Sequence, residues 1–224
     1  MSIAAKNPFV CGVLGWPLGH SLSPRIHQAG YQARGFQGSF VALPAPQGDQ
    51  ALEAARRRGF RGLAVTIPHK IMAARACKTL DPLARRLGAV NTVLFRPRGS
   101  KGFNTDVGGL LASLKSLGRG KAYRAGAVIG AGGAARAAVL ALEIQGAKTI
   151  HIAARRPSAA RSLARLPRRR TLVIIHPLSP EGLRAALGKA EVVINATPLG
   201  MWPHTKATPI PARLLHPRLA VLET

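Results

Sequence analysis

Several residue types are scarce in this sequence of 224 residues, and each scarcity excludes a class of protein. The chain contains only two cysteines, Cys11 and Cys77, which form neither a CxxC pair nor a disulfide framework. We therefore expect a reducing compartment and no metal site. Long apolar runs are also missing, because prolines and glycines interrupt even the N-terminal apolar segment of residues 1–19. This segment makes a poor signal peptide, and we expect a soluble, cytoplasmic protein.

Acidic residues are scarce as well. Eight Asp and Glu stand against 33 Lys and Arg, which gives a formal net charge of +25. Such a balance is compatible with a nucleic-acid partner. However, the arginines come in short scattered groups, and aromatic residues, at 4%, are too few to stack on bases. We expect a small-molecule substrate, no specific nucleic acid, no membrane, and a monomer or homodimer.

What the sequence does contain is an alternation of apolar β-branched runs with Ala-, Leu- and Arg-rich stretches, which predicts an α/β fold with largely parallel sheets. With 47% hydrophobic and only 18% charged residues, the chain can bury a sizeable core. The predicted strands are 9–15, 39–45, 62–67, 91–95, 126–131, 149–154, 171–177, 191–197 and 219–223. The predicted helices include 24–34, 49–58, 107–117, 134–145 and 158–166.

The composition changes at residues 117–126, a segment rich in glycine and cations that we interpret as the best domain boundary. The assignment is a substrate-binding and catalytic domain at 1–105 and a Rossmann domain that binds a dinucleotide at 106–224. The last predicted strand finishes at the end of the sequence, so we expect a chain truncated at its C-terminus.

The second domain carries a glycine-rich fingerprint between a strand and a helix. In "GAGGAARA", Gly130 permits a tight turn, Gly132 lets the backbone approach a pyrophosphate, and the small Ala135 allows close packing of helix and strand. A simple tight turn between packed elements is the alternative. The flanking strand and helix favour dinucleotide binding, with phosphates at the helix N-terminus.

The next strand, 149–154, indicates which dinucleotide binds. An NAD-specific site usually has a carboxylate here for the ribose 2′-hydroxyl, but this strand is followed by Arg155 and Arg156. An arginine at this place pairs with a 2′-phosphate. Two solvated arginines are the alternative; the missing acid favours NADP.

Polar residues also follow the strands of the first domain. Ser23 before Pro24 has the pattern of a helix N-cap, which leaves Ser21 unexplained. Together the two hydroxyls could bind a carboxylate. Asp106 precedes a helix and again has an N-cap as its alternative, whereas Lys70 stands alone after the strand of residues 62–67.

Six short motifs occur in one order along the chain: "GHSLSP", "VTIPHK", "GAVNT", "NTD", "GAGGAARA" and "INATPLGM". With them, the chain from about Phe9 to its end resembles the shikimate dehydrogenase family. The resemblance implies an N-terminal substrate domain, an NADP-binding Rossmann domain and an active site in the cleft between them. It also implies reversible, NADP-dependent reduction of 3-dehydroshikimate to shikimate in aromatic amino acid biosynthesis.

The resemblance further implies a role for each matching residue. Lys70 and Asp106 would be catalytic at the substrate hydroxyl, and Ser21 and Ser23 would bind the carboxylate. A lysine beside the carbonyl oxygen can stabilise negative charge and donate a proton. The other implied substrate residues are Thr66 and Asn91. The implied cofactor residues are Gly130, Ala131, Gly132, Gly133, Ala134, Arg155, Thr197 and Met201, with Asn195 and Ala196 in the stretch beside the nicotinamide.

Three departures from the family pattern leave alternatives open. Ala64 stands where the family usually has a substrate-binding Asn, and Val107 stands where it has Gly. The family's closing helix, with its substrate-binding Gln, is not in these residues. A binding or regulatory paralogue with an impaired site is therefore the second hypothesis, beside a quinate/shikimate dehydrogenase. A basic nucleic-acid-binding module is the third.

Overall fold

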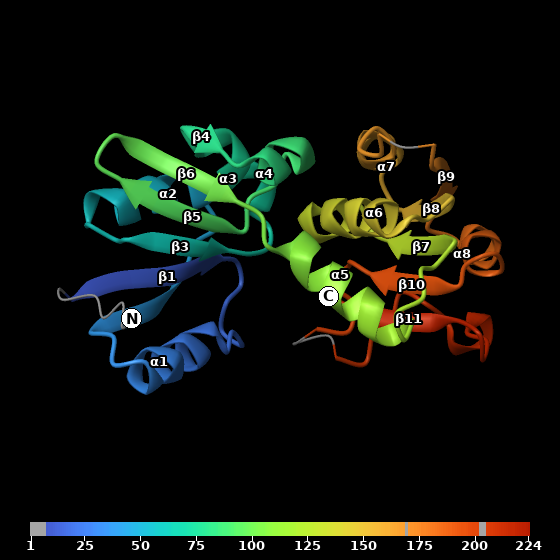
Figure 1. The fold of residues 1–224 in the computed structure, drawn as a ribbon, viewed down its shortest axis with the longest axis horizontal. Helices are drawn as coiled ribbons and strands as arrows, with labels where there is room; N and C mark the ends of the chain where they lie inside the picture. Colours follow the sequence, from blue (N-terminus) through green and yellow to red (C-terminus); the bar gives the residue numbers. More distant parts are fainter. Residues whose placement is uncertain (1–7, 169, 202–204) are drawn as a thin grey trace. The chain divides into compact units, whose positions relative to one another are not determined.

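A computed structural model gives the fold and describes residues 8–168, 170–201 and 205–224. Two parts of the sequence analysis fall outside the described residues. They are residues 1–7, at the start of the N-terminal apolar segment, and Arg169 in one of the arginine groups. The chain divides into two compact units, residues 1–105 and 106–224 (Figure 1), and each is described by itself.

The first unit is built on a six-stranded mixed sheet in the order β2-β1-β3-β5-β6-β4. β1, β2 and β3 are parallel, whereas β5 runs antiparallel to β3 and β6 antiparallel to β5. The prediction of largely parallel sheets is therefore wrong for this half of the sheet. The strands are β1 (Phe9–Gly15), β2 (Gly38–Pro44), β3 (Gly62–Val65), β4 (Thr79–Leu80), β5 (Thr92–Arg96) and β6 (Gly99–Phe103).

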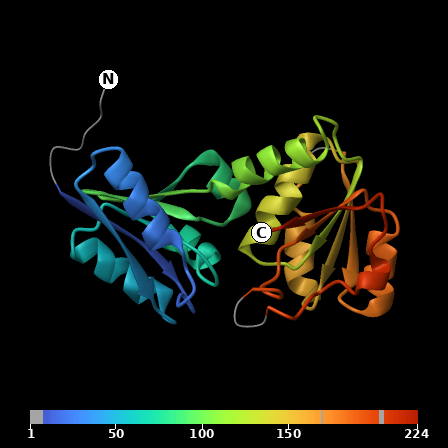
Figure 2. The same cartoon turned by 90° about the horizontal axis from the view of Figure 1, so that it is seen from below.

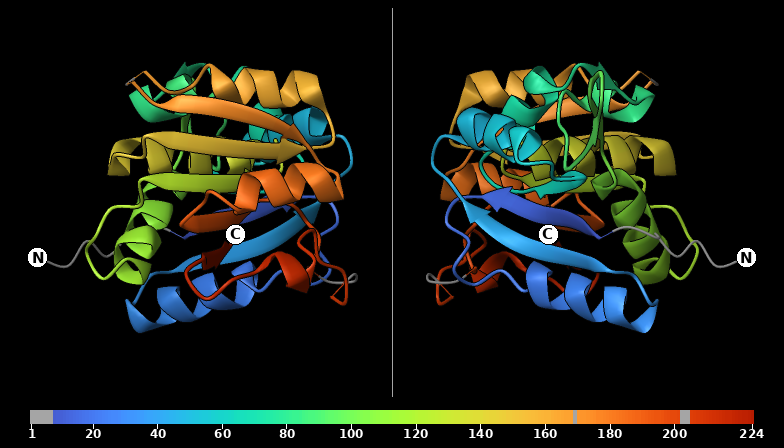
Figure 3. Two further views of the ribbon diagram at one scale, coloured as in Figure 1. Left: turned by 90° about the vertical axis from the view of Figure 1, so that its right-hand side faces the viewer. Right: turned by 90° about the vertical axis from the view of Figure 1, so that its left-hand side faces the viewer.

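Helices cover the two faces of this sheet unequally. The main core lies on the face with α2 and α3, where Leu14, Leu63 and Val93 are buried. On the other face α1 packs along β1 and β2, around Val13 and Phe40 (Figure 3, right). The helices are α1 (Ser23–Ala33), α2 (Gly48–Arg57), α3 (Lys70–Ala76) and α4 (Pro82–Leu87).

The second unit contains a parallel five-stranded sheet in the order β11-β10-β7-β8-β9. Its first strand, β7, lies in the centre, so the chain winds outward in one direction and then returns to wind in the other. This is the doubly wound arrangement of a mononucleotide-binding half, and its strand order reverses between β7 and β10. The strands are β7 (Ala125–Ile129), β8 (Thr149–Ala154), β9 (Leu172–Pro177), β10 (Val192–Asn195) and β11 (Ala220–Glu223).

Helices lie on both faces of this sheet (Figure 2). α6 packs on β7 and contacts α5 and α7, while α8 and the short 3₁₀ helix η1 pack together on the opposite face. The middle of α6 is buried without interruption from Ala137 to Glu143, as its run of Ala, Val and Leu predicts. The helices are α5 (Asp106–Leu117), α6 (Gly133–Gln145), α7 (Pro157–Ala164), α8 (Pro180–Leu187) and η1 (Ala212–Leu214).

The segment of residues 117–126 is not a boundary between the units. It joins α5 to β7 inside the second unit, because the division falls at residues 105 and 106. Its glycines and cations form the turn that reverses the chain between these elements. Main-chain bonds at Gly118, Arg119, Gly120 and Lys121 close that turn.

Candidate functional site

The carboxyl ends of β1 and β3 meet at one edge of the first sheet, and β5 begins there. The main-chain N–H of Thr66 donates to the Leu14 carbonyl at 2.9 Å, and that of Val65 donates to the Asn91 carbonyl at 2.7 Å. Thr66 and Asn91, both expected in the substrate site, are thus brought together at this edge, where polar side chains commonly bind ligands.

Lys70 lies at the same edge as the first residue of α3. Its carbonyl accepts the Val90 N–H at 2.8 Å, which ties the start of the helix to the residues before β5. The preceding His69 is only 5% exposed, and its Nε2 lies 2.7 Å from the Ala45 carbonyl oxygen. His69 therefore anchors the turn that presents Lys70. This role of His69 was not predicted from the sequence, although His69 directly precedes Lys70 in "IPHK".

The two Asn-Thr pairs of the sequence lie against each other. Asn91 Oδ1 accepts the Thr105 N–H at 3.0 Å, and Asn91 Nδ2 donates to Thr105 Oγ1 at 2.8 Å. The buried Asn104 donates to the Ala89 carbonyl at 3.1 Å. This network fixes the last residues of the first unit, directly before Asp106. α5 begins at Asp106 itself, so the carboxylate lies in the first turn, where negative charge is favourable.

The two serines take positions that differ in part from the expected ones. Ser23 is the first residue of α1 and Leu22 is its N-cap, which makes no side-chain capping bond. The N-cap interpretation of Ser23 is therefore wrong. Instead, the Ser23 N–H donates to Ser21 Oγ at 3.4 Å, which brings both hydroxyl-bearing residues into one turn after β1. Both are half-buried.

A hollow of about 610 Å³ lies on the face of the first sheet that carries α1. Its lining is mainly apolar and aromatic, and its polar lining residues include Arg61, Asn91, Thr92 and Thr105. Ala64 also lines it, next to Thr92 in the register of β3 and β5. Lys70, Ser21, Ser23 and Thr66 are not among its lining residues. Because the side chain of Ala64 is smaller than the Asn that the family usually has, this departure enlarges the hollow. The second departure, Val107, lies in α5 and is buried, with 1% exposure.

In the second unit, the glycine-rich fingerprint forms the loop between β7 and α6. Gly130 has a φ of +111°, and a Cβ there would come within 2.8 Å of the Ala196 carbonyl oxygen, so only glycine fits. A Cβ on Gly132 would meet nothing within 4 Å. The backbone at Gly132 therefore faces open space at the N-terminus of α6, which is where a phosphate can approach main-chain N–H groups.

That open space is a cavity of about 230 Å³ at the point where the strand order reverses. Arg155 and Arg156, both exposed, line it together with the glycine loop, and none of the described lining residues is a carboxylate. Glycines, a helix N-terminus and arginines suit a phosphorylated dinucleotide, so these residues fit the expected cofactor. The remaining lining residues are Ala131, Ala154, Leu178, Ala196, Thr197, Pro198 and Leu199.

The buried side chain of Asn195, which is 1% exposed, holds the loop after β10. Asn195 Oδ1 accepts from the N–H and the hydroxyl of Thr197, at 3.0 and 2.8 Å. Its Nδ2 donates to the Leu199 carbonyl and to Glu223 Oε2. Asn195 is therefore a brace for the cofactor loop rather than part of its lining, while the exposed Met201 lies beyond the lining residues.

Two features are missing from the described residues: a metal-binding cluster and a membrane-spanning helix. No group of three or more His, Cys, Asp or Glu is placed to hold a metal ion there. Within the same residues, no helix is both long and apolar enough to cross a membrane.

Comparison with known proteins supplies relatives for both units. A family profile described as the shikimate dehydrogenase substrate binding domain matches residues 13–93. The chain is 39% identical over 209 residues to a shikimate dehydrogenase (NADP(+)) of Moorella thermoacetica, covering 92% of this chain and 71% of that protein.

Solved structures resemble the chain over almost its whole length. Shikimate 5-dehydrogenase from Thermus thermophilus, in complex with NADP(H) and shikimate, is 35% identical with a TM-score of 0.79, covering 96% of this chain and 78% of that one. Quinate dehydrogenase from Corynebacterium glutamicum, in complex with NAD, is 27% identical with a TM-score of 0.81, covering 97% and 80%.

Proposed function

The chain belongs to the shikimate dehydrogenase family, and we propose that it is an NADP-dependent oxidoreductase that interconverts 3-dehydroshikimate and shikimate. The observation that carries this conclusion is 39% identity to a shikimate dehydrogenase (NADP(+)) over nearly the whole chain. The glycine loop and the cavity beside it fit the same cofactor.

NADPH, when bound, supplies the hydride to the carbonyl carbon of 3-dehydroshikimate. Gly130, Gly132 and the N-terminus of α6 would hold its pyrophosphate, and Arg155 its 2′-phosphate. Ala131, Gly133, Ala134, Thr197 and Met201 complete the proposed cofactor residues. Asn195 keeps the loop that carries Thr197 in one conformation.

The chain's own groups handle the substrate and the proton. Lys70 would donate the proton to the carbonyl oxygen and stabilise its developing charge, with Asp106 as its partner. Support for Lys70 comes from its half-buried place at the sheet edge that also holds Thr66 and Asn91. Thr66 and Asn91 would bind the ring substituents, and the turn of Ser21 and Ser23 would bind the carboxylate.

A spectrophotometric assay tests this function. NADPH with 3-dehydroshikimate should be consumed by the chain, and NADP⁺ with shikimate should be reduced, whereas NAD⁺ should react much more slowly. Binding of NADPH without turnover would instead support the paralogue with an impaired site, which Ala64 motivates. Turnover of quinate faster than of shikimate would change the substrate assignment but keep the cofactor.

The proposal also includes a location in the cell and an oligomeric state. We place the protein in the cytoplasm, which is supported by two free cysteines, Cys11 and Cys77, of which Cys77 is buried. We propose a monomer or homodimer, which light scattering after gel filtration would measure.

A further inference from the structure

The positive charge of the second unit is concentrated on one segment. From residue 144 to residue 180 the chain has no Asp or Glu, while it carries Lys148 and seven arginines. Arg155 and Arg156 line the cofactor cavity. Four of the arginines that follow are exposed on α7 and on the loop to β9: Arg161, Arg165, Arg168 and Arg170. These four are named the arginine ridge.

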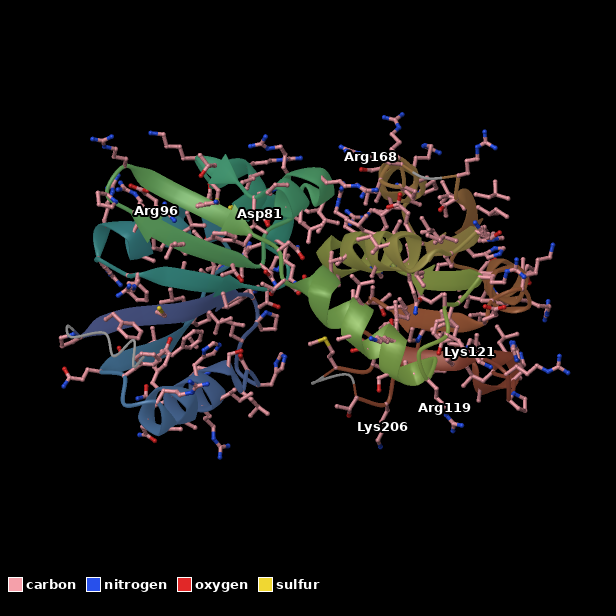
Figure 4. The ribbon with its side chains drawn as sticks, in the orientation of Figure 1. Asp81, Arg96, Arg119, Lys121, Arg168 and Lys206 are labelled. Atoms are coloured by element: carbon pink, nitrogen blue, oxygen red, sulfur yellow. The ribbon has the colours of Figure 1, made fainter. Side chains whose placement is uncertain are left out.

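The backbone beneath the arginine ridge is anchored. On α7, Ala160 and Leu163 are fully buried, and in the following loop Leu166 is buried as well. The Thr171 hydroxyl donates to the Ala147 carbonyl at 3.0 Å. The apolar side chains therefore point inward and hold the segment on the sheet, while the four arginines point to solvent; Figure 4 shows Arg168 beside α7.

The nearest carboxylate reinforces this arrangement without exposing negative charge. Glu143 is 1% exposed, and its Oε1 accepts the main-chain N–H of Arg168 at 2.7 Å. The bond orders the loop of the arginine ridge, but the carboxylate is buried beneath it. Other acidic residues have similar structural duties elsewhere: Asp81 caps α4, Glu191 accepts the Arg124 N–H, and Glu223 accepts from Asn195.

We infer that the arginine ridge binds the phosphate backbone of double-stranded nucleic acid without sequence preference. Exposed guanidinium groups on an anchored backbone, with no acidic side chain in their own segment, attract phosphates, and binding releases the counterions of the nucleic acid. A duplex is favoured over single strands because the segment of residues 144–180 has no Phe, Trp or Tyr on which bases could stack. The sequence alone predicts only scattered arginines; α7 and its loop gather them.

The test measures fluorescence anisotropy of a labelled 20-base-pair duplex of arbitrary sequence at several salt concentrations. The variant R161Q/R165Q/R168Q/R170Q removes the ridge. A control variant, R25Q/R34Q/R58Q/R75Q, removes the same charge from exposed positions of the first unit. We expect the ridge variant to bind at least about tenfold more weakly at low salt, with a log–log salt slope smaller by about 3 to 4, since each phosphate contact contributes about 0.9.

The control variant should keep most of the affinity and of the slope. Equal losses in both variants would overturn the proposal, because the effect would then be that of net charge alone. Absence of salt-dependent binding by the unmodified chain would also overturn it, as would displacement of the duplex by poly-glutamate at equal charge, which would indicate acidic proteins instead. Affinity for NADP⁺ should be unchanged in the ridge variant, which shows that it is folded and separates this proposal from the enzymatic one.

Discussion

The side-chain amide of Asn91 holds Thr105 through two hydrogen bonds, one to its main-chain N–H at 3.0 Å and one from Nδ2 to its hydroxyl at 2.8 Å. Since Thr105 immediately precedes Asp106, this bond pair sets the start of the chain segment that carries the proposed catalytic carboxylate. Besides its proposed role as a substrate ligand, Asn91 is therefore a residue that positions Thr105.

The first prediction concerns Thr105→Val, which removes the hydroxyl and keeps the side-chain size. Losing one hydrogen bond should lower the unfolding free energy by about 1 kcal/mol, and kcat should fall because Asp106 is held less firmly. Thr92→Val is the matched control, since the Thr92 hydroxyl also donates to Asn91 Oδ1, at 3.0 Å, but does not precede Asp106. Urea unfolding and steady-state kinetics measure both quantities. Equal kcat losses in the two variants would contradict the positioning role.

The second prediction concerns the proposed acid–base pair. Lys70→Ala should lower kcat by about 10²- to 10⁴-fold, the usual contribution of a general acid, with NADP affinity intact. Asp106→Asn should be similarly damaging, and the double variant should be little worse than the worse single one. Lys78→Ala, at an exposed lysine of the same unit, is the control and should keep kcat. If the two losses multiplied, the residues would act independently.

Cofactor choice gives the third prediction. A hydrogen bond to a charged group contributes about 1.5–3 kcal/mol, so Arg155→Ala should weaken NADP⁺ about tenfold or more and leave NAD⁺ nearly unchanged. Arg218→Ala, an exposed arginine outside the cavity lining, should change neither. Titration of the two cofactors, followed by fluorescence or calorimetry, gives both constants. An equal loss for NADP⁺ and NAD⁺ would remove Arg155 from the 2′-phosphate site.

The fourth prediction separates the two serines. Ser21→Ala should raise KM for shikimate without a change in NADP⁺ affinity. Ser23→Ala should also raise KM, but it should change the unfolding free energy by less than about 0.5 kcal/mol, because Leu22 and not Ser23 occupies the N-cap. Ser179→Ala, where Ser179 Oγ accepts the Gly182 N–H at 3.2 Å, should cost about 1 kcal/mol and serves as the comparison. An unchanged KM in both site variants would exclude a carboxylate at this turn.

The fifth prediction is a pH dependence of stability. On the α8 face of the second sheet, His151 Nδ1 lies 2.9 Å from His176 Nε2. Burial lowers the pKa of both imidazoles, and for His151 the charges of His176 and Lys189 lower the pKa further. The unfolded chain therefore binds more protons than the folded one just below pH 6.5, so the unfolding free energy falls as the pH falls through this range.

Thermal unfolding of the chain between pH 8 and pH 5 measures this effect. The variant H151F/H176F should lose less of its Tm over this interval than the unmodified chain does. His216→Gln, at a half-buried histidine of the same unit, should keep the full pH dependence. Parallel Tm curves for the unmodified chain and the double variant would show that the pair does not contribute.

The strands and helices with strong periodicity could be predicted from the sequence, but the antiparallel half of the first sheet could not. β6, Gly99–Phe103, reads "GSKGF", which has neither apolar alternation nor β-branched residues. Its strand geometry comes from pairing with β5 across a tight turn, so that Arg96 is opposite Gly99. Tertiary pairing overrides a weak local preference here.

A residue of the candidate site could be predicted from the sequence where only one residue type suits the backbone or the chemistry of its position. Gly130 is an example, since its left-handed backbone and its contact with Ala196 admit only glycine. The roles of Asn91 and Asn195 were not predictable in the same way, because an amide can bind a ligand or brace a loop with the same atoms. Only the positions of Thr105 and Thr197 show that bracing is one of their functions.

The passage of the chain from one unit to the other at residues 105 and 106 also bears on synthesis in the cell. Within the described residues, each sheet is made of strands from one continuous stretch, and none of these strands is exchanged between the two. The ribosome therefore synthesises every strand of the first sheet before the first strand of the second. Because domains commonly fold as units during translation, the first sheet can form while the cofactor-binding unit is still being assembled.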